Sequence, residues 1–316
     1  MYKFIDLFAG IGGFRIAAEE FGWECVFSSE IDKAAARAYY ENFKDYPLGD
    51  ITKIDEKDIP SHDILCAGFP CQPFSVGGYR KGFEDTRGTL FFDIARILAY
   101  HQPRFFILEN VPGLVTHDNG KTFEIIKATL KELGYMIWYD VLNGVEFGVP
   151  HNRRRIFIVG FREKKDFEQF NFKIPNIKPP KLKEVLDFDF YEDYLAPTQT
   201  ALKHLYKHLE LKGIDINSFD DDFVIASEIR PSRAAIRLNP EVMNTLPAKM
   251  GTGGNNVPLI VTKNFVRKMS VKEGLRLLGF PEWFRLKENY MQSYKQIGNS
   301  LIVPIVREIF KALPPR

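Results

Sequence analysis

The stretch from Gly68 to Ser75 most restricts how this chain can fold, because it ends a run of apolar residues abruptly. The run Ile64–Ala67 has the length and apolarity of a buried parallel strand. One glycine and two prolines follow, so the strand cannot continue and Cys71 is predicted to lie on a rigid loop at its carboxyl end. Open α/β sheets bind ligands at that edge. The sequence therefore predicts a binding site with a cysteine beside it.

Cys71 has two interpretations. A fixed loop can aim its sulfur for nucleophilic attack, while nearby positive charge favours the thiolate. Alternatively it is an inert buried thiol, as most free cysteines are. Together with Cys25 and Cys66 it makes three cysteines, too few for a disulfide framework and without the spacing of a zinc site. Taken alone, the motif favours the inert thiol; the other blocks of the chain favour the nucleophile.

The N-terminal segment predicts a nucleoside-binding turn. Phe4–Phe8 is a short apolar strand, Ala9–Gly13 is rich in glycine, and Phe14–Glu20 begins a helix. This order brings a ligand close to the backbone at a helix N-terminus. Arg15 occupies the place of the third glycine in Gly-x-Gly-x-x-Gly, which argues against a dinucleotide. Glu30, at the end of the next predicted strand, is placed to bind ribose hydroxyls.

Two later blocks place charged residues beside predicted strands. The apolar run Arg104–Leu108 is followed by Glu109, which we expect in the same crevice as Cys71. The alternative is an exposed acid that caps a turn. Arg153 and Arg155 precede another buried apolar run, and in an extended chain they point to the same side.

Taken together, these blocks resemble those of the cytosine-5 DNA methyltransferases. The compact length of the chain resembles that of the bacterial members, which accompany a restriction endonuclease. The resemblance covers about residues 2–160 and 265–304. It implies a Rossmann-like, mostly parallel α/β sheet with an inserted, smaller target-recognition domain. The family pattern Gln-x-Arg-x-Arg begins with His151 here, while both arginines are kept.

The resemblance also implies the roles of individual residues. Cys71 would attack the base, Glu109 would stabilise charge at N3, and Arg153 or Arg155 would bind the O2 side. Asp50 would bind the adenine amino group of S-adenosylmethionine, although its position is equally that of a turn cap. The residues implied in binding this cofactor are Phe8, Gly10, Gly12, Gly13, Glu30, Ile31, Asp50, Pro70, Leu90, Asn299 and Ser300. Those implied in binding DNA are Gln72, Ser75, Arg80, Arg87, Arg237, Thr245, Gly253 and Gly254.

A change in composition near Lys173, where prolines and lysines become frequent, predicts a domain boundary. We expect residues 1–175 and 290–316 to form the catalytic, cofactor-binding domain. Residues 176–289 are expected to form the target-recognition domain with a hinge helix. The net charge of +2 is uninformative by itself, since a DNA-binding surface needs its positive charge gathered on one face.

The expected partner is double-stranded DNA, with a cognate restriction endonuclease as a genetic rather than physical partner. No metal is expected, and the protein is expected to be a monomer. No apolar run approaches the roughly 20 residues that span a bilayer, and the first residues enter a predicted strand without a signal peptide. We therefore expect a cytoplasmic protein of a bacterium, associated with the nucleoid when it is bound to DNA.

Three other functions would account for some of the same residues. A nicotinamide dehydrogenase shares the first strand, loop and ribose acid, but it explains neither the prolines around Cys71 nor Glu109. An RNA (tRNA) cytosine-5 methyltransferase uses similar chemistry and is the main alternative, although the long region from Lys173 to Lys263 suits the recognition of duplex DNA. A DNA-binding protein without catalysis is disfavoured by the intact Cys71, Glu109, Arg153 and Arg155.

Overall fold

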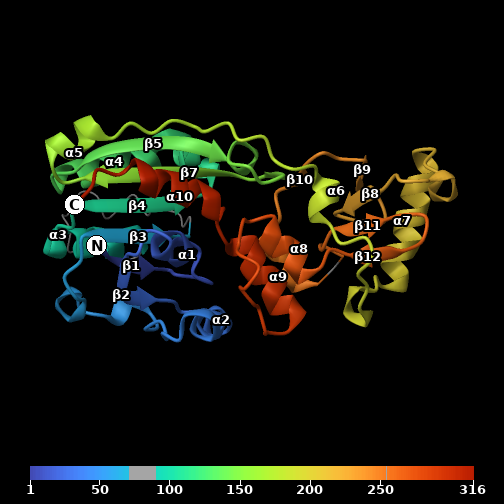
Figure 1. Cartoon of the computed structure of the whole chain (residues 1–316), viewed down its shortest axis with the longest axis horizontal. Coiled ribbons are helices and arrows are strands. Elements are labelled where there is room, and N and C mark those ends of the chain that lie inside the picture. Colours follow the sequence, from blue (N-terminus) through green and yellow to red (C-terminus); the bar gives the residue numbers. More distant parts are fainter. Residues whose placement is uncertain (71–89, 254) are drawn as a thin grey trace. The chain divides into compact units, whose positions relative to one another are not determined.

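The computed structural model describes residues 1–70, 90–253 and 255–316, which divide into two compact units (Figure 1). Unit 1 comprises Met1–Asn143, Arg154–Pro175 and Leu301–Arg316, and unit 2 comprises Gly144–Arg153 and Asn176–Ser300. The helix α9 (Tyr290–Asn299) lies in unit 2, although residues 290–316 are expected from the sequence to belong to the catalytic domain. Its Gly298 lies so close to Ala248 that an added Cβ would be 2.4 Å from the Ala248 nitrogen.

Unit 1 is built on a six-stranded sheet in the order β2-β1-β3-β4-β7-β5. The strands are β1 (Lys3–Leu7), β2 (Glu24–Ser29), β3 (Ile64–Gly68), β4 (Phe105–Asn110), β5 (Met136–Asn143) and β7 (Arg154–Phe161). Strand β7 is antiparallel to both of its neighbours, and the other pairs in this sheet are parallel. The predicted mostly parallel α/β fold is therefore confirmed.

Helices cover the sheet because its strands are apolar on both faces. The helices of unit 1 are α1 (Gly13–Glu19), α2 (Lys33–Phe43), α3 (Leu90–His101), α4 (Lys121–Glu132), α5 (Lys164–Gln169) and α10 (Val303–Ala312). Ile5 and Leu7 of β1 belong to one buried cluster with Ile94 of α3 and Ile126 of α4. Since side chains alternate along a strand, Asp6 points to the opposite face.

The C-terminal segment completes unit 1. Leu301 fills the space beside Gly13, where an added Cβ would be 2.8 Å from its Cδ1. Helix α10 packs on α1, and the Tyr2 hydroxyl donates a 2.7 Å hydrogen bond to the Pro314 carbonyl. Residues from both ends of the chain therefore build the same domain, and unit 2 is inserted between them.

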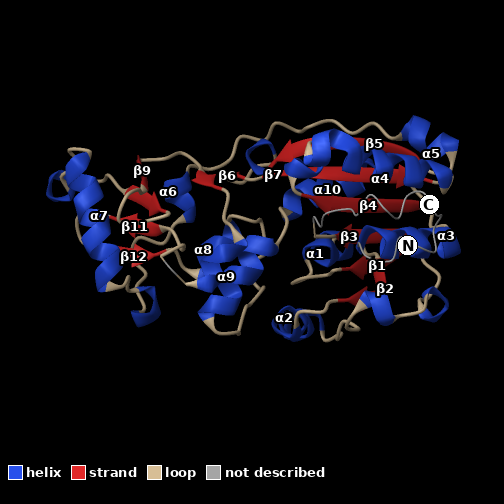
Figure 2. Cartoon of the chain, turned by 180° about the vertical axis from the view of Figure 1, so that it is seen from behind, coloured by secondary structure: helices blue, strands red, loops and turns tan. Residues whose placement is uncertain are grey.

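Unit 2 has a different architecture, built on a small antiparallel sheet (Figure 2). Its order is β12-β11-β8-β9, from β8 (Val224–Ser227), β9 (Ala235–Leu238), β11 (Leu259–Val261) and β12 (Val266–Lys268). Helix α7 (Gln199–Leu211) packs its Leu205 and Leu209 on this sheet. Outside the sheet lie α6 (Leu182–Val185), α8 (Val271–Arg276) and the short parallel pair β6 (His151–Asn152) and β10 (Met243–Asn244).

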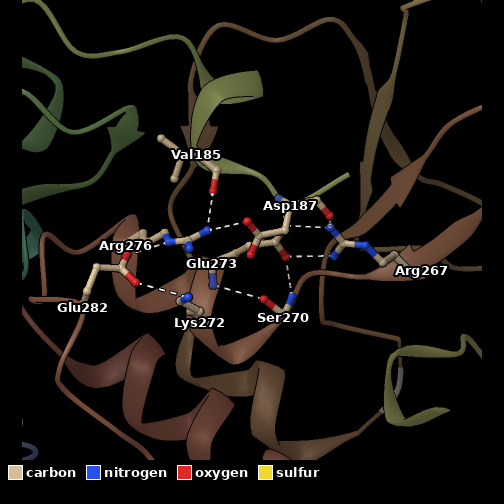
Figure 3. Close-up of polar contacts among 8 residues, drawn as sticks. All are labelled: Val185, Asp187, Arg267, Ser270, Lys272, Glu273, Arg276 and Glu282. Carbon is tan, nitrogen blue, oxygen red and sulfur yellow. Dashed lines mark hydrogen bonds and ion pairs between the residues drawn. The ribbon is translucent and has the colours of Figure 1, made fainter. Parts of the chain in front are cut away.

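A buried ion pair anchors the start of α8 (Figure 3). The side chains of Arg267 and Glu273 are both 0% exposed and 2.7 Å apart. The Glu273 carboxylate also accepts the main-chain N–H groups of Ser270, at 2.6 Å, and Asp187, at 2.8 Å. Ser270 caps α8 in return, since its hydroxyl accepts the Glu273 N–H at 3.1 Å. These bonds satisfy both charges inside unit 2.

Replacing Glu273 by alanine should destabilise unit 2 strongly, because it leaves the Arg267 charge buried without its partner. Breaking a buried pair in this way costs about 3–5 kcal/mol. The matched control is Glu282→Ala, since the Glu282 side chain is 64% exposed and pairs with Arg276 on the surface. That change should cost under about 1 kcal/mol. Urea unfolding followed by circular dichroism measures both, and equal losses would contradict the proposed anchor.

Candidate active site

The carboxyl ends of four parallel strands of unit 1 lie at one edge of the sheet. Strands β1, β2, β3 and β4 run in the same direction, so their carboxyl ends meet there. Strands β1, β2 and β3 lead into the glycine loop, Glu30 and the loop before Cys71, and Glu109 is the second-last residue of β4. This is the edge at which open α/β sheets bind ligands.

The glycine loop makes a tight turn before α1. Phe8, Gly10 and Gly12 all have positive φ, at 54°, 56° and 89°, and the first of these is a strained conformation for a side chain of that size. At Gly12 an added Cβ would be 2.3 Å from the Phe43 ring, so the side chain of Phe43 packs against the loop at this position. Among the described residues, a Cβ added at Gly10 would meet nothing closer than 4.0 Å. The loop is therefore closed on the protein side and open at Gly10.

Glu30 joins the end of β2 to this loop. Its carboxylate accepts the Gly10 N–H at 2.8 Å and the Asp32 N–H at 2.7 Å. Burial raises the pKa of Glu30, while these two main-chain donors oppose the rise. Each carboxylate oxygen can accept a second hydrogen bond, which suits the two hydroxyls of a ribose. The neighbouring Ile31 side chain is 68% exposed.

Asp50 adopts the turn-capping role that the sequence left open. Its side chain accepts hydrogen bonds from the Thr52 N–H at 3.1 Å and the Thr52 hydroxyl at 2.8 Å. These bonds lower the pKa of Asp50, so the carboxylate is ionised. It caps the short 3-10 helix Ile51–Lys53.

Asp6 is a buried acid in β1, next to the glycine loop, that sequence reasoning did not single out. It is 0% exposed, and neither of its carboxyl oxygens has a hydrogen-bond partner among the described residues. Burial raises the pKa of Asp6 well above its ordinary value. The signal in the sequence is a single acid inside the apolar strand Phe4–Phe8, next to the glycine loop.

The loop before Cys71 is fixed by the neighbouring strand. Asn110, at the end of β4, donates from its side-chain amide to the Phe69 carbonyl at 2.8 Å. Phe69 is itself buried. The role of Asn110 could not be predicted from the sequence, because its partner Phe69 lies 41 residues away, just after β3. Cys71 lies outside the described residues, and so do Gln72, Ser75, Arg80, Arg87 and Gly254.

Glu109 and Arg155 form an ion pair at the same edge. The Arg155 Nε lies 3.0 Å from Glu109 Oε1, and each side chain is 12% exposed. Burial lowers the pKa of Arg155, and the adjacent Glu109 carboxylate opposes this effect. In the β3–β4 pairing Gly68 lies opposite Glu109, and an added Cβ on Gly68 would be 3.5 Å from Glu109 Oε2. The acid therefore lies beside the loop that leads to Cys71.

Arg153 is not brought into this pair, which differs from the sequence expectation that it and Arg155 point the same way. Its guanidinium, in unit 2, donates to the carbonyls of Leu246 at 2.9 Å, Gly298 at 2.8 Å and Ser300 at 2.5 Å. The residue is only 1% exposed. The physical reason is that the extended strand β6 ends at Asn152 and β7 begins at Arg154, so simple alternation does not hold across Arg153.

The described residues expected to bind DNA lie together in unit 2. Arg237 of β9 donates to the side chain of Asn244 at 2.8 Å, and the Thr245 hydroxyl donates to the Asn152 carbonyl at 2.7 Å. Arg237, Asn244, Thr245 and Lys249 line a cavity of about 170 Å³. Gly253 has a φ of 80°.

The remaining residues expected to bind the cofactor lie at the ends of helices or of the described segments. Leu90 begins α3, and Pro70 ends the first described segment. In unit 2, Asn299 ends α9 and Ser300 is its C-cap.

Comparisons with known proteins agree on one family. The family model of the C-5 cytosine-specific DNA methylases matches residues 2–314. The chain is 45% identical to the type II methyltransferase M.HaeII of Haemophilus aegyptius over 310 residues, covering 98% of this chain and 91% of that protein. It is 40% identical to the type II methyltransferase M.HhaI of Haemophilus parahaemolyticus over 317 residues, covering 97% and 92%.

Among solved structures, a mutant of the Spodoptera frugiperda protein DNMT2 superposes with a TM-score of 0.73 at 20% sequence identity, covering 99% of both chains. At that identity the likeness concerns the fold. Among the described residues, no helix combines the length and the hydropathy needed to cross a membrane.

Gly12→Ala should distort the glycine loop, because the new methyl group meets both an unfavourable φ and the Phe43 ring. A left-handed conformation costs about 1–2 kcal/mol for a residue with a Cβ, and overpacking adds about 1–3 kcal/mol. Gly22→Ala is the matched control, since Gly22 has a φ of 70° but no atom within 4 Å of the added Cβ. Thermal unfolding should show the larger loss for Gly12→Ala. Equal losses would mean that packing against Phe43 does not hold the loop.

Proposed function

Because the chain belongs to the C-5 cytosine-specific DNA methylase family, we propose that it transfers a methyl group from S-adenosylmethionine to C5 of a cytosine in a short double-stranded DNA sequence. The observation that carries this proposal is the Glu109–Arg155 pair beside the loop that leads into Cys71. The relatives named as type II methyltransferases support a role in protecting host DNA from a cognate restriction endonuclease.

The chemistry requires a nucleophile, because C5 of cytosine does not attack a methyl donor unaided. The Cys71 thiolate adds to C6 of the ring, and the electron pair of the C5–C6 bond becomes available at C5. After C5 has gained the methyl group, loss of the C5 proton to a base expels the thiolate and restores the aromatic ring.

The other two cysteines are poorly suited to this role. Burial raises the pKa of Cys25 to about 12 and that of Cys66 well above its ordinary value. Near neutral pH both are therefore thiols, and a thiol is a much weaker nucleophile than a thiolate. The raised pKa values of these two thiols support Cys71, rather than Cys25 or Cys66, as the nucleophile.

Glu109 and Arg155 are placed to stabilise the charge that addition of the thiolate creates. In the free protein they neutralise each other. When the base enters, N3 approaches Glu109 and O2 approaches Arg155. Exclusion of water by the base favours the neutral form of Glu109, so this residue can hold a proton at N3, while Arg155 opposes negative charge at O2.

The residues of the first two strand ends fit an adenosylmethionine. Gly10 leaves open space, Glu30 offers two oxygens for ribose hydroxyls, and the exposed Ile31 is adjacent to it. Phe8 precedes the loop, and Asp50 would hold the adenine amino group with the carboxylate that also caps its turn. When bound, the cofactor supplies an electrophilic methyl group on a sulfonium.

Unit 1 would therefore be the catalytic domain and unit 2 the target-recognition domain. Arg237, Thr245 and Gly253 of unit 2 would contact DNA, and Lys249 beside them would add phosphate affinity. The target cytosine must leave the helix, because its C6 is not accessible in a stacked base. Its extrusion costs a few kcal/mol, which contacts in the pocket offset.

Cys71→Ser should abolish methyl transfer while adenosylmethionine binding persists, because serine lacks the reactive thiolate. The test is incubation with a 5-fluorocytosine duplex and the cofactor, since fluorine cannot leave as a proton does. The wild type should remain covalently attached to this duplex in a denaturing gel, and Cys71→Ser should not. Cys25→Ser, the same change at a cysteine with a raised pKa, should trap normally. A wild type that never traps would exclude the covalent mechanism.

Glu109→Gln should slow methyl transfer about 10²-fold or more, because the amide keeps the shape of the side chain but cannot deliver a proton. Single-turnover transfer of a labelled methyl group to duplex DNA measures this step directly. Glu124→Gln is a matched control, since Glu124 lies on α4 in a surface pair with Lys127. An unchanged rate for Glu109→Gln would remove this residue from the mechanism.

A further inference from the structure

His151 is buried at a position where the related methyltransferase pattern has glutamine. It is 0% exposed and lies in β6, which pairs with β10 through Met243 opposite His151 and Asn244 opposite Asn152. The described hydrogen bonds of its ring connect two separate segments of unit 2. Its Nδ1 lies 2.9 Å from the Leu277 carbonyl, and its Nε2 lies 3.2 Å from the Leu246 nitrogen.

These partners fix the protonation of the ring. The Leu246 N–H can only donate, so Nε2 must accept and carry no proton. The Leu277 carbonyl can only accept, so Nδ1 must carry the proton and donate. His151 therefore performs both tasks only as a neutral imidazole in one tautomer.

Leu246 is held from both sides of its main chain. His151 accepts from its N–H, and Arg153 donates to its carbonyl at 2.9 Å. Between these two residues, the Asn152 carbonyl accepts from the Thr245 hydroxyl at 2.7 Å. Leu246 is buried whereas Thr245 is exposed. The two hydrogen bonds to the Leu246 main chain therefore set the position of the exposed Thr245 beside it.

We infer that His151 is a positioning residue for DNA recognition: as a neutral imidazole it holds the segment Asn244–Leu246 in place, and in acid it releases that segment. This inference rests on the proposed methylation of DNA. Protonation would put a second N–H donor at Nε2, facing the Leu246 N–H, so a buried donor would lose its acceptor. Asn244 and Thr245 would then lose their fixed position. Both line the same cavity as Arg237.

The charged residues on the surrounding elements do not favour the imidazolium form. Arg153 is on the same segment and is cationic, and Lys249, beyond Leu246, is paired with Glu228. On and after α8, Glu273 pairs with Arg267, Lys272 pairs with Glu282, and Arg276 pairs with Asp187 and Glu282. The acids named here are thus paired with other cations, and Glu146 lies in the 3-10 helix Gly144–Glu146, which contacts β6.

The test compares His151→Gln with the wild type from pH 8 down to pH 5, a range that reaches well below the ordinary histidine pKa of about 6.5, because burial and hydrogen bonds to the neutral ring oppose protonation. A glutamine amide can accept from Leu246 with its oxygen and donate to Leu277 with its nitrogen, and it does not titrate. In the wild type, KM for duplex DNA should rise about tenfold from pH 7.5 to 5.5, the effect of one buried donor losing its partner. In His151→Gln it should stay within about twofold.

Two further variants control for other effects. His208→Gln makes the same change at another largely buried histidine of unit 2, whose ring nitrogen bonds only the Arg230 carbonyl among the hydrogen bonds described, so it should keep the wild-type profile. His151→Leu loses both hydrogen bonds and should raise KM for DNA at pH 7.5 as well. If His151→Leu does not fold, the comparison of His151→Gln with the wild type decides alone.

The outcomes separate the inference from the proposed function. A wild type that methylates no duplex DNA at pH 7.5 refutes the proposed function. An active wild type whose KM profile coincides with that of His151→Gln refutes the positioning role of a neutral His151. A rise in KM confined to enzymes with histidine at position 151 supports it.

Discussion

The pairing of β3 with β4 is the constraint on which the site depends. Gly68 lies opposite Glu109, so the loop before Cys71 starts beside this acid. A slip of one residue would turn Glu109 to the other face of the sheet. The bond from Asn110 to the Phe69 carbonyl holds this register where the strands end. The pairing of these two buried strands thereby fixes the distance between Glu109 and the residues just before Cys71, which a free loop could not maintain.

Much of unit 1 could be predicted from the sequence because its signals are local. Short apolar runs that stop at glycine, proline or an acid predict parallel strands, and the structure has strands at Ile64–Gly68 and Phe105–Asn110. The edge at which Glu30 and Glu109 lie follows from strand direction alone. The pairing of Arg155 rather than Arg153 with Glu109 could not be predicted, because it depends on where β6 ends and β7 begins.

Unit 2 was harder to predict because its order depends on contacts between distant residues. Its sheet has strands of only three or four residues, too short for a clear alternation of polar and apolar side chains. Arg153 reaches carbonyls 93 and 145 residues away, and no local pattern encodes such partners. The buried Arg267–Glu273 pair likewise looks in the sequence like an ordinary surface pair.

The five residues from His151 to Arg155 show how a short motif can serve both units. His151 and Arg153 bond the main chain of Leu246 in unit 2, whereas Arg155 bonds Glu109 in unit 1. The border between the units falls between Arg153 and Arg154. Spacing the three side chains by two residues therefore places His151 and Arg153 against Leu246 and places Arg155 against Glu109. A change of spacing would break one set of bonds or the other, which gives a physical reason for a motif that looks like a simple basic cluster.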